Sequence, residues 1–226
     1  MASQLDLQEQ EQLDQLKAFW NRHGNLLTWV VTLALVALAA FNGWNWWQRE
    51  QASKAAALHA ELERAVLAGE TERVAAAWSD LKTRYPTTAF APQGALLAAK
   101  LWTEREQTEP AVAALQWVAD AASQAEYRAV ARLRWAGLLL DQSKAQEALD
   151  VLEKARGAGF DALVEDRRGD ALMALQKADQ ARDAYQAAWK GLPSDLDYRR
   201  IIEAKLMSLG VDPSTLEPAG KTKDAT

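Results

Sequence analysis

Residues 161–193, DALVEDRRGDALMALQKADQARDAYQAAWKGLP, decide the fold of this chain. The stretch divides into two segments of helix-forming residues, and a proline ends the second. Small, bulky and aromatic residues stand where two paired helices would touch: Gly169, Leu172, Ala181, Tyr185, Ala188 and then Pro193. A side chain larger than that of Gly169 would push the two helix axes apart. The stretch therefore predicts a helical hairpin.

This order of residues matches the tetratricopeptide pattern, and three further copies precede it. The copy before it contains Ala136, Leu139, Ala148, Leu152 and Ala155. An earlier copy contains Ala99, Trp102, Ala111, Leu115 and Val118, and a degenerate first copy contains Leu62, Ala65, Val74, Trp78, Leu81 and Pro86. Val74, Ala111, Ala148 and Ala181 are equivalent and lie 37, 37 and 33 residues apart. These intervals are close to the period of about 34 residues that defines the repeat.

The sequence after the last repeat predicts a cap and a tail. Ile201, Ile202, Leu206 and Leu209 form an apolar stripe that would cover the open end of the stack. Residues 210–226 have no apolar period and contain two prolines, so we expect a flexible tail. The predicted fold class is all-α, with a single N-terminal transmembrane helix, a solenoid of about four helix pairs over 48–209, and a C-terminal capping helix.

Residues 26–47, LLTWVVTLALVALAAFNGWNWW, carry no charge. A helix of about 22 residues rises about 33 Å, which is enough for a hydrocarbon layer of about 30 Å. Trp29 lies toward one end and Trp44, Trp46 and Trp47 at the other, where indole rings favour the membrane interface. We predict a transmembrane anchor over 25–47 and an N-terminal segment over 1–24.

A buried core helix and a cleaved signal peptide are the alternatives to an anchor. A helix of this length that is apolar on all sides is difficult to bury inside a small domain. Ala37-Leu38-Ala39 fits a cleavage site, but the preceding segment is long and net acidic, unlike the short basic start of a signal peptide. We therefore expect an uncleaved signal anchor, in which Ala39 and Gly43 form a small-residue pair that could contact another membrane helix.

Charge leaves the membrane orientation open. Lys17 and Arg22 precede the apolar segment, and Arg49 and Lys54 follow it, so the positive-inside rule gives a tie. The chain beyond residue 48 contains 24 basic and 27 acidic residues. Such a balanced domain is a poor polyanion binder, and we expect no nucleic-acid partner.

The composition excludes most kinds of reactive site. No cysteine is present, and the two histidines, His23 and His59, cannot form a two-histidine metal face at helical spacing. Phosphate loops, dinucleotide glycine motifs and nucleophile motifs are missing, and the carboxylate pairs Glu165/Asp166 and Glu147/Asp150 fit solvated helix faces. We predict no catalytic residues, no cofactor and no metal site; a hydrolase with an unusual site is the remote alternative.

The predicted solenoid offers a binding surface on its concave face, which the first helix of each pair lines. The repeat register places five residues there: Gln93, Lys100, Asp166, Asp170 and Met173. Mixed charge with few large apolar groups suits transient contacts with extended or partly folded chains. The alternative is a featureless solvated face, and the sequence does not decide between the two.

Two stretches, EQEQLDQLKAFWNRHGN over 9–25 and LRWAGLLLDQSKAQEALDVLEKARGAGFDALVEDRRGDALMALQKADQARDAYQAAW over 133–189, resemble the YfgM family of ancillary Sec translocon subunits. The resemblance extends over the acidic start, the anchor, the repeats and the ending AKLMSLG, and GAGFDALVEDRRGDAL over 157–172 is its most specific part. It implies a single-pass protein of the bacterial inner membrane, with its N-terminus in the cytoplasm and its repeats in the periplasm.

The resemblance also implies partners: the SecYEG translocon, a PpiD-type chaperone and unfolded secreted chains, besides the membrane lipid. The expected function is that of a non-enzymatic scaffold at the translocon. A membrane-tethered tetratricopeptide scaffold or assembly factor for another cell-envelope complex would share the fold and remains the rival prediction.

Overall fold

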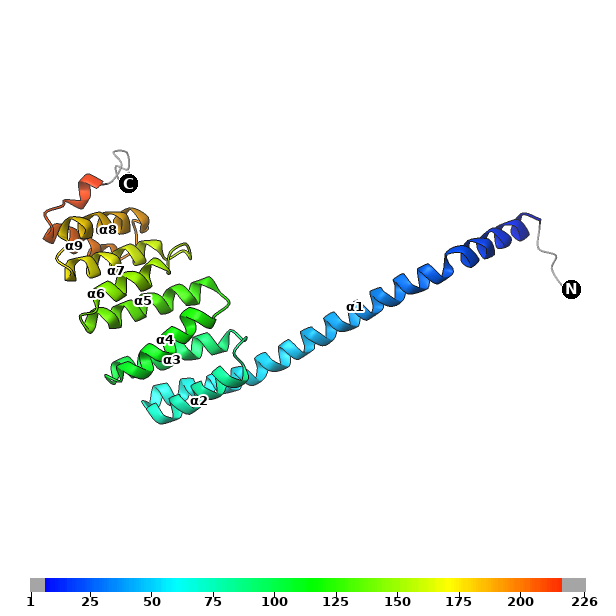
Figure 1. Cartoon of the computed structure of the whole chain (residues 1–226), viewed down its shortest axis with the longest axis horizontal. Helices are drawn as coiled ribbons and strands as arrows, with labels where there is room; N and C mark the ends of the chain where they lie inside the picture. The colour runs from blue at the N-terminus through cyan, green and yellow to red at the C-terminus, as the bar shows by residue number, and fades with distance from the viewer. Residues whose placement is uncertain (1–6, 217–226) are drawn as a thin grey trace, which may run out of the picture. The chain divides into compact units, whose positions relative to one another are not determined.

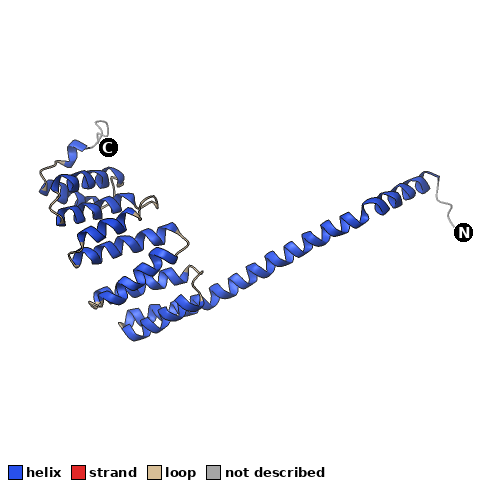
Figure 2. Ribbon diagram, in the orientation of Figure 1, coloured by secondary structure: helices blue, strands red, loops and turns tan. Residues whose placement is uncertain are grey.

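The computed structural model describes residues 7–216. The chain forms two compact units, which meet in sequence at Ser53 and Lys54. Helix α1, Leu7–Ala68, contributes residues to both units. No strand occurs among the described residues, and helices joined by short loops make up the fold (Figure 2). The all-α prediction is confirmed.

The first unit consists of the N-terminal part of α1. Its apolar side chains are exposed along the segment predicted to span the membrane; Leu33, Phe41 and Trp46 each expose more than three-fifths of their surface. Water solvates such an apolar surface poorly, whereas the hydrocarbon tails of lipid solvate it well. Within the described chain, α1 is the one helix long and apolar enough to cross a bilayer.

The second unit is a stack of helix pairs, and from α2 onward each helix contacts the next along the chain (Figure 1). The end of α1 pairs with α2 (Thr71–Arg84), α3 (Phe90–Glu104) with α4 (Thr108–Ala121), α5 (Ala125–Asp141) with α6 (Ala145–Glu153), and α7 (Asp161–Ala174) with α8 (Ala178–Gly191). Helix α9 (Arg199–Ser208) follows and packs on α8. The four predicted pairs and the capping helix are all present.

The turns inside the four pairs repeat the same backbone geometry. Gly69, Glu106, Ser143 and Gln176 follow the first helix of each pair with φ of 70°, 58°, 60° and 61°. In each turn the next residue donates its N–H to a carbonyl five residues back, as Gln107 does to Trp102 at 2.8 Å and Lys177 to Leu172 at 2.9 Å. This is the Schellman arrangement, which satisfies carbonyls left over at a helix end. Its recurrence at intervals of 37, 37 and 33 residues confirms the register of the repeats.

The signature positions form the core between paired helices. Ala111, Ala148 and Ala181 have no exposed surface, and the degenerate first pair packs in the same way through Leu62, Val74 and Leu81. A side chain on Gly169 would overlap the ring of Tyr185 from the facing helix. The small residues are therefore needed because aromatic or branched groups occupy the space opposite them.

One residue has unexpected surroundings, and one expectation needs correction. His59 is buried against Phe90 with a ring-centroid distance of 5.5 Å, because α3 of the second pair packs on this side of α1. The predicted flexible tail begins too early. Pro213–Leu216 form a 3-10 helix, and Val211 and Leu216 pack on the cluster around α8 and α9. Isolated apolar residues beside prolines have no period, so the sequence pattern did not reveal this packing. Residues 217–226 of that tail lie outside the described residues.

Candidate partner-binding groove

The first helices of successive pairs lie side by side and share a recess. Helix α5 contacts both α3 and α7. Between them is a recess of about 430 Å³, which we call the central groove. Its lining includes Lys100, Thr103 and Glu104 of α3, Leu133, Arg134, Gly137, Leu138 and Asp141 of α5, and Arg167 of α7. The tetratricopeptide register thus places one helix face from three consecutive pairs around a single space.

The floor of the central groove is apolar, and one of its residues is a glycine. Leu133 and Leu138 contribute side chains, while Gly137 contributes none. A methyl group on Gly137 would lie 4.0 Å from the guanidinium carbon of Arg167 and would meet nothing closer. The glycine therefore leaves room beside the leucines for a side chain from another molecule.

Three cations surround this floor, and their bonds within the chain are weak or incomplete. Lys100 lies 3.7 Å from Glu104, and both side chains are more than half exposed. Arg134 donates a hydrogen bond of 3.1 Å to the carbonyl of Leu96, and Arg167 lies 3.6 Å from Asp170. An exposed ion pair such as Lys100–Glu104 contributes about 0–1 kcal/mol, so an incoming polar group could replace it at little cost.

A buried polar cluster joins α7 to α9 beyond the groove. Lys205 donates to Asp166 at 2.7 Å and to Asp170 at 2.6 Å. Tyr198 donates to Asp166 at 2.6 Å, and Tyr185 donates to Asp170 at 2.8 Å. Burial, and then the hydrogen bond to a carboxylate, raise the pKa of both Tyr185 and Tyr198 well above the ordinary value of 10.0. The cluster thus holds neutral hydroxyls and one ammonium group against two carboxylates.

The five predicted partner residues fall in different surroundings. Lys100 lines the central groove, and Met173 is 39% exposed on α7. Gln93 is half-buried and donates to the hydroxyl of Tyr127 on α5 at 2.5 Å. Asp170 and Asp166 belong to the buried polar cluster, and Asp166 is only 1% exposed. We therefore correct the assignment of Asp166: it is a structural residue that holds the cap, because its carboxylate is satisfied inside the protein.

Several groove residues were not predicted, although the register contained the signal for them. Gly137 is equivalent to Lys100 and Asp170, and Arg134 is equivalent to Arg167 one repeat later. The prediction drew residues from the second and fourth repeats and omitted the third, which supplies five of the eleven residues that line the groove.

In the first unit, Ala39 and Gly43 are exposed, and a methyl group on Gly43 would meet no atom within 4 Å. Their contact with another membrane helix remains a prediction. Across residues 7–216, no group of three or more histidine, aspartate or glutamate side chains lies close enough together to hold a metal ion.

Comparison with known proteins gives one consistent result. A family model for a tetratricopeptide repeat-like domain matches residues 17–211. A protein of Neisseria gonorrhoeae named ancillary SecYEG translocon subunit is 30% identical over 207 residues, which are 90% of this chain and 98% of the relative. A protein of the same name from Escherichia coli is 29% identical over 83% of this chain and 89% of the relative. Another, from Haemophilus influenzae, is 22% identical over 80% of this chain and 89% of the relative.

Proposed function

Since the chain belongs to the family of ancillary SecYEG translocon subunits, with their tetratricopeptide repeat-like domain, we propose that it is itself a non-enzymatic ancillary subunit of the Sec translocon. The observation that carries this proposal is the extent of the match. It includes 98% of the length of the Neisseria relative, so the apolar helix and the repeats are shared together.

The apolar part of α1 is proposed to hold the chain in the bacterial inner membrane, with residues 1–24 in the cytoplasm and the repeats in the periplasm. The length and composition of the helix support spanning. The orientation follows from the proposed role, because a subunit that meets secreted chains needs its binding domain on the side where they emerge. Ala39 and Gly43 are the proposed contact with a membrane helix of the translocon.

The central groove is proposed to receive extended polypeptide, either a secreted chain leaving the translocon or a segment of a PpiD-type chaperone. Its leucine floor can bury an apolar side chain, and the space at Gly137 admits one. Its exposed pair of Lys100 and Glu104 is weak and can exchange partners. A surface of this kind favours transient binding of many sequences over tight binding of one.

Site-specific photocrosslinking in intact cells tests the proposal. The photoreactive residue replaces Lys100 in the groove, exposed Met173 on α7, Ala39 in the anchor, and exposed Asp150 on α6 as a control away from the groove. We expect SecYEG subunits at Ala39, and secreted chains or the chaperone at Lys100 and Met173 but not at Asp150. Capture of components of a different envelope complex at the groove and the anchor would instead support the assembly-factor alternative.

A further inference from the structure

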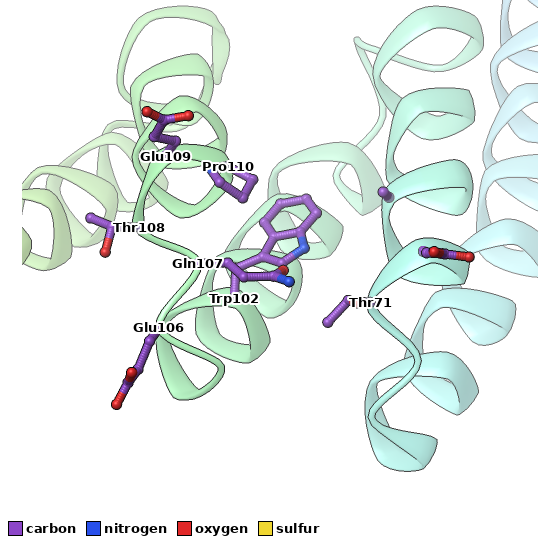
Figure 3. Close-up of a pocket in the computed structure, with 9 residues that line it drawn as sticks. Thr71, Trp102, Glu106, Gln107, Thr108, Glu109 and Pro110 are labelled. Carbon is purple, nitrogen blue, oxygen red and sulfur yellow. The ribbon is translucent and has the colours of Figure 1, made fainter.

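A second recess, of about 540 Å³, lies at the turn edge of the first two pairs and shares no lining residue with the central groove. We call it the edge recess. Helix α2 contributes Glu72 and Ala75, the end of α3 contributes Trp102, and the following turn and α4 contribute Glu106, Glu109 and Pro110 (Figure 3). All of these residues belong to the second unit.

The edge recess has an apolar floor. Trp102 is 4% exposed, so most of its indole is packed in the core, and one edge remains at the recess. In Figure 3 the indole lies between Pro110 of α4 and Thr71 of α2. A long aliphatic stem could cover this edge together with Ala75 and Pro110.

The charged residues that line the recess are acidic. Glu72, Glu106 and Glu109 are exposed, and no lysine, arginine or histidine is among the lining residues. Helices α2 and α4 both begin at the recess, and each N-terminus contributes about half a positive charge. The guanidinium of Arg105 also lies close by, against Gly69 in the turn before α2, so a net charge of about −1 remains.

The other pairs of the same stack show that this charge is a local feature. Glu72 and Glu109 stand in the first turn of their helices, as Glu147 and Asp179 do in α6 and α8, and the helix dipole accounts for acids at that position. It does not account for Glu106. The equivalent turns read Ser143-Lys144 and Gln176-Lys177, and leucine replaces Trp102 in both later repeats. Among the four turns, a glutamate at the positive-φ position and an indole at the position of Trp102 occur together at this edge, where Arg105 precedes Glu106.

We propose that the edge recess binds a lysine or arginine side chain carried by an extended segment of a partner protein. The aliphatic stem would lie along Trp102 and Pro110, and the cationic head would lie among the three carboxylates. Because the central groove is separate, the domain could hold two polypeptide segments at once. This inference goes beyond the proposed function and does not depend on which complex the chain joins.

Fluorescence anisotropy with two labelled Gly/Ser peptides tests the inference on the full chain in detergent micelles. One peptide carries a central Arg-Leu-Arg and the other a central Glu-Leu-Glu, and both are titrated at low ionic strength. We expect the arginine peptide to bind and the glutamate peptide not to bind. The double variant Glu106→Gln/Glu109→Gln should weaken binding of the arginine peptide by about 2- to 30-fold.

Matched variants separate the edge recess from a general attraction to an acidic protein. Glu147→Gln/Asp179→Asn removes the same number of charges from first turns elsewhere in the stack and should leave the affinity within about 2-fold. Ala75→Lys places a competing cation in the recess and should abolish binding, whereas Ala76→Lys, on the exposed neighbour outside the recess, should not. Equal effects within either matched pair, or equal binding of the two peptides, would overturn the inference.

Discussion

Replacing Lys205 with methionine tests how the cap is held on the stack. The ammonium group lies 2.7 Å from a carboxylate oxygen of Asp166 and 2.6 Å from one of Asp170. Without it, the 1%-exposed Asp166 keeps only the hydroxyl of Tyr198, beside a second carboxylate. Removing one partner of a buried ion pair costs about 3–5 kcal/mol. Since Lys205 is 26% exposed and water can reach the site, we expect the free energy of unfolding to fall by about 2–3 kcal/mol.

The measurement is a urea titration of the full chain in mild detergent, followed by far-ultraviolet circular dichroism and repeated as a thermal melt. The expected loss corresponds to a Tm lower by about 5–10 °C. Arg182→Met is the control: its ion pair with Asp179 is 3.0 Å long but highly exposed, so its loss should cost less than about 1 kcal/mol. Lys205→Met/Asp166→Leu should recover part of the loss, because no unpaired buried charge remains at Asp166. Equal destabilisation by Lys205→Met and Arg182→Met, or a double variant as unstable as the sum of its two single variants, would refute this reasoning.

Three further predictions concern the stack. Gly169→Ala should destabilise the fold by about 1–3 kcal/mol, because its methyl group would overlap Tyr185. Gly137→Ala has room for the methyl group and should stabilise the fold by up to about 1 kcal/mol; equal Tm values for the two variants would contradict this packing. Ser143→Gly and Gln176→Gly should each raise the free energy of unfolding by about 0.5 kcal/mol in urea titrations, since glycine adopts their positive φ without strain, and Gly69→Ala should lower it. Above pH 10.0 tyrosines of the unfolded chain ionise while folded Tyr198, with its raised pKa, keeps its proton, so the free energy of unfolding should fall as pH rises. The urea midpoint of Tyr198→Phe should fall less steeply with pH than that of the unchanged protein, and parallel plots of midpoint against pH would exclude this cause.

The part of the fold that could be predicted is the part that repeats. Ala111, Ala148 and Ala181 are small because the facing helix leaves no room, and that requirement recurs in the three later pairs at intervals of 37 and 33 residues. The four turns have the same spacing, but of their positive-φ residues only Gly69 is of a type that predicts a positive φ. Glu106, Ser143 and Gln176 adopt it because the Schellman bonds and the packing of the pair require it, which outweighs local preference.

The part that could not be predicted depends on single partners far apart in the chain. Asp166 appears in the sequence as one of several charged residues on α7, and its burial follows from Lys205 and Tyr198, which lie on the cap. His59 is buried for a similar reason, because Phe90 packs against its ring. Neither partner is visible in a periodic pattern, since periodicity identifies the face of a helix and not the group that covers it.

One position of the repeat explains why the central groove lies in the middle of the face formed by the first helices. Lys100, Gly137 and Asp170 are equivalent along the first helices of three consecutive pairs. At Asp170 the position is closed, because Lys205 of the cap binds its carboxylate and Tyr185 donates to it. At Gly137 there is no side chain to close it, and Lys100 is bound only by an exposed glutamate. The cap therefore does more than cover the last apolar face, because it also binds the carboxylates of Asp166 and Asp170. On the face formed by the first helices, the leucine floor beside Gly137 stays open to a partner, between a cation from α3 and a cation from α7.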